Sequence, residues 1–131
     1  MIFLDTSAIY AWADKADPNH QIAVGRLQEI LDLQEELMTH NYIVLEAVSL
    51  LQGRLGQSVA TKFLKDTSAF NVEWVDRDLH AIATREFERA GKRRLSFVDH
   101  VSFLVMKRRS VQTAFAFDPD FRVAGFQLFE P

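Results

Sequence analysis

The chain has 131 residues, of which 48% are hydrophobic and 25% are charged, with no cysteine and a formal net charge of −3. This composition allows one domain with a sizeable core, and it excludes disulfides, thiolate zinc sites and cysteine nucleophiles. The sequence shows no membrane-length apolar run, no signal-peptide layout and no global attraction to nucleic acid, so we expect a cytoplasmic protein.

A strand and two helices are predicted in the first part of the chain. The apolar residues 1–4 stop at Asp5, and so short an apolar run is typical of a strand buried on both faces of a parallel sheet. A helix follows directly. Asp17 and Pro18 fit an N-cap and a first-turn proline, and the apolar spacing from His20 onward predicts a long amphipathic helix.

The rest of the chain alternates between short apolar runs and amphipathic segments. Strands are expected at 37–39, 72–75, 114–117 and, at an exposed edge, 126–129. Helices are expected at 41–51 with Gly53 and Gly56 at its end, near 59–64, from Asp76 to Gly91, and at 96–106. This alternation predicts an α/β fold: a three-layer α/β/α domain with a mostly parallel sheet of four to five strands, spanning residues 1–131 as a single domain.

Four carboxylates occupy positions where such a fold places ligands, at the ends of strands and in the helices that follow them: Asp5, Glu46, Asp99 and Asp118. Three of them have an ordinary alternative explanation. Asp5 and Asp118 could simply cap helices, and Asp99 matches a capping box with Ser96. For each of these three taken singly, capping and function are equally good interpretations.

Glu46 is harder to explain by capping. It lies in the middle of an apolar helix, where a lone buried charge is costly. With Tyr42, Ser49 and Gly53 it forms a polar or small stripe at helical spacing. This stripe either faces solvent or points across the carboxyl edge of the sheet, and the second alternative would bring Glu46 to the aspartates.

A cluster of these four carboxylates would require a counter-charge, because like charges in one cleft cannot all stay ionised. A divalent cation supplies that charge, and oxygen ligands without cysteine or paired histidines favour Mg²⁺ or Mn²⁺ over Zn²⁺. Such a cation can activate a water and polarise a phosphoryl oxygen. The pattern therefore indicates phosphodiester hydrolysis.

The sequence resembles the PIN-domain family, and most closely its VapC-type toxin ribonucleases of toxin–antitoxin pairs. The resemblance covers essentially the whole chain and rests on four segments in the family's order and spacing: 3–7, 42–46, 95–99 and 117–121. It implies a Mg²⁺- or Mn²⁺-dependent endoribonuclease with Asp5, Glu46, Asp99 and Asp118 as catalytic and metal-binding residues. It also implies an RNA substrate, a small antitoxin partner and a homodimer.

Supporting residues are suggested by the resemblance and by charge. Thr6 or Ser7 resembles the hydroxyl that the family keeps beside its first aspartate. Asp120 either shares the metal shell or caps a short helix, and the capping role is slightly favoured. Charge alone suggests that a basic triplet binds substrate phosphates: Lys92, Arg93 and Arg94.

Two positions depart from the family's pattern. Ala116 stands where the family usually has Thr, Ser or Asn, and Pro119 stands where a basic residue is frequent. These departures leave a non-catalytic PIN-like module, which binds RNA or a protein, as one alternative. A PIN nuclease that acts in RNA maturation or on DNA is another.

Overall fold

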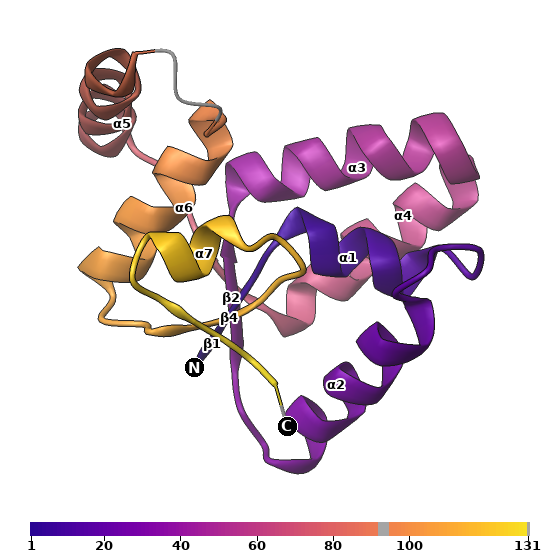
Figure 1. The fold of residues 1–131 in the computed structure, drawn as a ribbon. Helices are drawn as coiled ribbons and strands as arrows, with labels where there is room; N and C mark the ends of the chain where they lie inside the picture. The colour runs from indigo at the N-terminus through magenta and orange to yellow at the C-terminus, as the bar shows by residue number, and fades with distance from the viewer. Residues whose placement is uncertain (92–94, 131) are drawn as a thin grey trace.

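The fold is built on a parallel sheet that runs through the middle of the molecule (Figure 1). The computed structural model describes residues 1–91 and 95–130 of the chain. Within these residues five strands lie in the order β3-β2-β1-β4-β5, and every pairing is parallel. The strands are β1 (Ile2–Leu4), β2 (Leu37–His40), β3 (Asn71–Glu73), β4 (Thr113–Phe115) and β5 (Gln127–Leu128).

Helices cover both faces of this sheet. The described residues form α1 (Thr6–Ala13), α2 (His20–Asp32), α3 (Asn41–Leu55), α4 (Gln57–Asp66), α5 (Arg77–Ala90), α6 (Phe97–Arg108), α7 (Asp120–Val123) and a 3-10 turn, η1 (Thr67–Ala69). In Figure 1, α5 and α6 lie on one side of the sheet, and α1, α2 and α4 lie on the other, which confirms the predicted α/β/α fold. None of these helices is long and apolar enough to cross a membrane.

The central strands are buried, as the apolar runs predicted. Every residue of β1 and β2 is buried, and Phe3, Met38 and Ala114 have no exposed surface. Phe3 pairs with Met38 of β2 on one side and with Ala114 of β4 on the other. This register brings the carboxyl ends of β1, β2 and β4 together at one edge of the sheet, where open α/β folds bind ligands.

The start of α2 and the end of α3 differ from the sequence prediction. α2 begins at His20 with Asn19 as its N-cap, so the prediction that Asp17 caps this helix was wrong. The Asp17 carboxylate instead accepts a hydrogen bond from the backbone amide of Asn19 (2.8 Å), which closes a local turn before the helix starts. α3 runs on through Gly53 and ends at Gly56, whose φ of +98° is a conformation that glycine adopts readily.

Candidate metal centre

Asp5 lies between β1 and α1 and connects the carboxyl end of β1 to that of β4. Its side chain caps α1, because one carboxylate oxygen accepts hydrogen bonds from the amide (3.1 Å) and the hydroxyl (2.6 Å) of Ser7. Its own amide donates to the carbonyl oxygen of Phe115 at the end of β4 (3.1 Å). The Ser7 hydroxyl accepts a further hydrogen bond from the amide of Phe117 (3.0 Å). Ser7 therefore ties Asp5 to the segment that carries Asp118.

Asp5 is almost completely buried, with 6% of its surface exposed. Burial raises the pKa of its carboxyl from the ordinary 3.8 to about 6; the hydrogen bonds from Ser7 lower this pKa, and the negative charges of Asp99 and Asp118 raise it. Both aspartates therefore act on the Asp5 carboxyl electrostatically. A cation at this position would stabilise the ionised form of Asp5.

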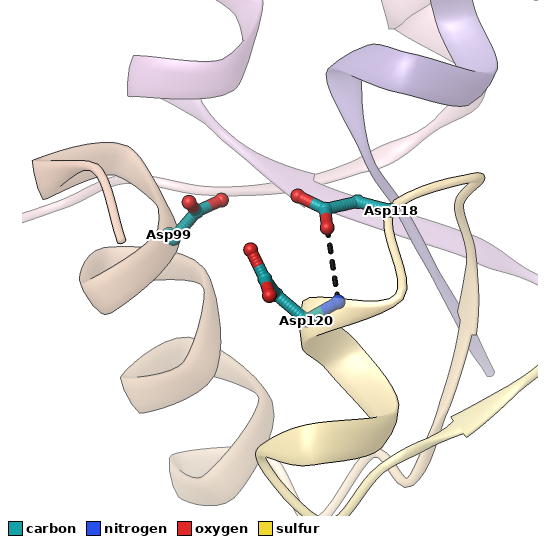
Figure 2. A group of neighbouring side chains, drawn as sticks. All are labelled: Asp99, Asp118 and Asp120. Atoms are coloured by element: carbon teal, nitrogen blue, oxygen red, sulfur yellow. Dashed lines mark hydrogen bonds between the residues drawn. The ribbon is translucent and has the colours of Figure 1, made fainter. Parts of the chain in front are cut away.

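Three further carboxylates converge on one another, and Figure 2 shows them pointing toward one another. Asp99 comes from the first turn of α6, Asp118 from the loop after β4, and Asp120 from the first residue of α7. Each offers an oxygen atom, and these three atoms lie within 4.8 Å of one another. The Asp118 carboxylate is oriented by a hydrogen bond that it accepts from the amide of Asp120 (2.9 Å). These three residues would suit a hard divalent cation such as Mg²⁺, because all the atoms they offer are carboxylate oxygens.

Asp99 also forms the capping box that the sequence predicted. Its carboxylate accepts a hydrogen bond from the amide of Ser96 (3.0 Å), and its own amide donates to the Ser96 hydroxyl (3.1 Å). Capping and membership of the acidic cluster therefore occur together, although the sequence presented them as alternatives. The cap also fixes the direction in which the Asp99 carboxylate points.

Glu46 is linked to the site through Thr6. Its carboxylate accepts a hydrogen bond (2.6 Å) from the hydroxyl of Thr6, the residue that follows Asp5. Glu46 is exposed, whereas Thr6 is buried. The polar stripe on α3 is therefore exposed to solvent and also lies at the carboxyl edge of the sheet, so the two alternatives offered by the sequence hold together. The two hydroxyls after Asp5 have separate partners: Thr6 holds Glu46, and Ser7 holds Asp5.

The remaining predicted residues fall into two groups. Asp120 lies in the acidic cluster at the first residue of α7, so its role in a metal shell stays a prediction that the proposed function takes up. The Asp-x-Asp spacing at the start of a helix does not by itself predict this, because Asp76 and Asp78 have the same spacing at the start of α5 and lie outside the cluster. Asp118 joins the cluster although Ala116 carries no hydroxyl. The basic triplet, Lys92, Arg93 and Arg94, lies outside the described residues.

His40 is buried at the end of β2, where it positions α3. Its Nδ1 accepts a hydrogen bond from the amide of Ile43 (3.3 Å), so Nε2 carries the proton and donates to the Ser102 hydroxyl (2.9 Å). Burial lowers the pKa of His40 to about 3, and the ring is therefore neutral at physiological pH. Through this cap His40 fixes the start of the helix that carries Glu46.

The chain is similar to known proteins in sequence and in fold. The family model described as PIN domain matches residues 2–127. The 23S rRNA-specific endonuclease VapC20 of Mycobacterium tuberculosis is 37% identical over 133 aligned residues, which cover 100% of this chain and 99% of the relative. The crystal structure of VapC20, described as a sarcin–ricin loop cleaving toxin, matches with a TM-score of 0.86 at 33% identity and covers 100% of both chains. FitAcB from Neisseria gonorrhoeae matches with a TM-score of 0.69 at 20% identity, over 100% of this chain and 98% of its own, which is a likeness of fold alone.

Proposed function

The chain belongs to the PIN domain family, and on this basis we propose that it is a divalent-metal-dependent endoribonuclease acting as one domain over residues 1–131. The observation that carries the proposal is the convergence of Asp99, Asp118 and Asp120, of which Asp99 and Asp118 also act electrostatically on the buried Asp5. Carboxylates gathered this closely need a positive charge among them, and the donor set consists of oxygen. These residues therefore fit Mg²⁺ or Mn²⁺.

The site residues have different roles in this proposal. Asp5, Asp99 and Asp118 would hold the cation, and Asp120 would offer a further oxygen. The cation, when bound, supplies the charge that activates a water and polarises a phosphoryl oxygen. Glu46 is exposed and fixed by Thr6, which suits its carboxylate to accept a proton or a hydrogen bond from the attacking water.

We take the substrate class from the VapC20 relative. That protein is specific for 23S rRNA, and its structure is described as that of a sarcin–ricin loop cleaving toxin. The 37% identity covers the whole of this chain, which supports a ribosomal RNA hairpin as the first substrate to test. A cytoplasmic location follows from such a substrate.

The proposal also includes a small antitoxin partner and a homodimer, as the resemblance to VapC-type toxins implies. Leu31 in α2 (56%) and Leu33, its C-cap (63%), are exposed, and apolar side chains of this kind are available for contacts with another chain. Mass measurement of the purified protein at several concentrations tests the dimer. A monomer at every concentration would contradict it.

The catalytic proposal is tested by cleavage of a labelled sarcin–ricin-loop hairpin in Mn²⁺, Mg²⁺ or EDTA, with wild type and Asp99→Asn. We expect cation-dependent cleavage by the wild type and none by the variant. Asp76→Asn is the matched control, because Asp76 also caps a helix by accepting from the amide of Leu79 (2.8 Å) but is not part of the acidic cluster. This control should cleave at the wild-type rate.

Two results would contradict the proposal. Equal cleavage by wild type and Asp99→Asn would remove Asp99 from the catalytic site. Failure to cleave the hairpin or total RNA, with no rise in Tm on adding Mn²⁺, would support the non-catalytic PIN-like module instead, because a ligand that binds the native state must stabilise it.

A further inference from the structure

Five aromatic side chains form a continuous set of ring contacts between α3, α5 and α6. This ring cluster consists of Tyr42, His80, Phe87, Phe97 and His100. Phe97 stacks on Tyr42 with ring centroids 6.3 Å apart, and it lies 5.2 Å from His80. The Tyr42 hydroxyl and His80 Nδ1 are hydrogen-bonded at 2.6 Å. This bond holds the two rings in a fixed relative orientation.

The ring cluster borders the acidic site. Tyr42 lies one helical turn before Glu46, so the two side chains share one face of α3. α6 carries both Phe97 and Asp99 in its first turn, on different faces of the helix, so the link between the ring cluster and the site runs through Tyr42 and Glu46. The cluster is also open to solvent, because His80 and Phe87 are exposed and Tyr42 and Phe97 are only partly buried. A molecule held at the carboxylates therefore has aromatic surface within reach.

An RNA strand needs a source of affinity besides charge at this site. The protein has a net charge of −3, and carboxylates attract phosphate only through a bound cation. Stacking on Phe, Tyr or His rings does not depend on net charge, and it is the usual way in which proteins bind unpaired RNA bases. Bases inside a duplex are already stacked on their neighbours, whereas a loop base is free to leave the strand.

Building on the proposed ribonuclease function, we propose that the ring cluster is a base-binding platform. Tyr42, supported by Phe97, stacks on the unpaired base of a nucleotide next to the scissile phosphate. The hydrogen-bonded pair of Tyr42 and His80 presents polar atoms at the margin of the platform, where they contact the edge of the base. The enzyme thereby selects RNA with an unpaired base at the cleavage site, and this selectivity resides in α3, α5 and α6 rather than in the metal centre.

The experiment pairs one protein change with one RNA change. The cleavage site of the wild type is first mapped in the hairpin, and each flanking nucleotide is then replaced by an abasic ribose. At one flanking position we expect kcat/KM to fall about tenfold or more, mainly through KM. Tyr42→Leu should cause a similar loss with the intact RNA and no further loss with the abasic RNA, because the base and the ring form a single contact. Tyr42→Phe, which keeps the ring, should retain most of the affinity.

Binding of the same RNAs in EDTA, followed by fluorescence anisotropy, gives a readout that does not depend on cleavage. The matched control is Phe126→Leu: Phe126 is partly buried and contacts Phe103 (centroids 5.6 Å apart), but it precedes β5 and so lies toward the opposite edge of the sheet. This variant should bind and cleave like the wild type. If Tyr42→Leu does not fold, Phe97→Leu replaces it in the cycle.

The outcomes separate this inference from the proposed function. Independent, additive losses from the abasic RNA and the Tyr42 change would overturn the platform, as would a wild type that cleaves intact and abasic RNAs equally. In both cases the ribonuclease itself would stand. A wild type that cleaves no RNA would remove the proposed function, and the platform with it.

Discussion

Replacing Asp5 with asparagine is expected to stabilise the fold at neutral pH while abolishing activity. The pKa of the Asp5 carboxyl is about 6 in the folded protein and 3.8 at its ordinary value, so the unfolded chain releases this proton first as the pH rises. Between these two pKa values the folded state binds more protons than the unfolded state, and the free energy of unfolding therefore falls as the pH rises. Above pH 6 the wild type carries the full cost of an ionised, buried carboxylate.

The size of this effect follows from the pKa difference. One pKa unit corresponds to about 1.4 kcal/mol, so a difference of about 2 units amounts to about 3 kcal/mol. Asparagine has nearly the same shape, does not ionise, and its amide oxygen can still accept the hydrogen bonds from Ser7. Because part of this cost is already present at pH 4, the variant should gain about 2.4 kcal/mol of stability relative to the wild type between pH 4 and pH 7.

The assay is urea denaturation in EDTA at several pH values between 4 and 8, with the difference between variant and wild type as the measured quantity. This difference is needed because His40 gives the wild type a pH dependence of opposite sign in the same range. Asp76→Asn, an exposed N-cap substitution, is the control for the effect of changing a helix-capping aspartate to asparagine outside the acidic cluster. Parallel pH profiles for wild type and Asp5→Asn would refute the reasoning. Added Mn²⁺ should stabilise the wild type at pH 7.5 more than the variant.

Three further predictions concern the groups around Asp5. Burial lowers the pKa of His40 to about 3, so protonation of His40 opposes folding as the pH falls below 6.5. His40→Asn should therefore shift the midpoint of acid unfolding to lower pH. An unchanged midpoint would contradict this. Ser7→Ala removes the hydroxyl hydrogen bond that lowers the pKa of Asp5 and keeps the one from the backbone amide. The acidic limb of the pH–rate profile should therefore move to higher pH, and stability should fall by about 1–3 kcal/mol in denaturation curves. Thr6→Val removes the hydrogen bond that holds Glu46 (2.6 Å). The kcat of this variant should fall with little change in Tm. Equal kcat values for the variant and the wild type would show that Glu46 does not need this contact.

The strand–helix alternation could be predicted from the sequence because its causes are local. A short apolar run that stops at Asp5 forms a strand, and a serine three residues before Asp99 forms a capping box, whatever the rest of the chain does. Candidate carboxylates at the ends of these elements could therefore be named in advance. The limit of local signals appears at Asp17, where a cap and a turn have the same sequence signature and the turn forms.

The meeting of the carboxylates depends on the tertiary structure. Asp5, Asp99 and Asp118 lie far apart in the chain, and they meet because β1 pairs with β4 while α6 packs over the same edge of the sheet. The position of Asp120 depends on the turn of the chain at Pro119, which no periodicity predicts. The ring cluster around Tyr42 likewise joins three helices from separate parts of the chain. The sequence by itself determined which side chains stand at the ends of elements, because caps and apolar runs are local. Sheet order and helix packing decided which of these side chains touch. Such contacts join segments whose separation in sequence does not predict their distance in space.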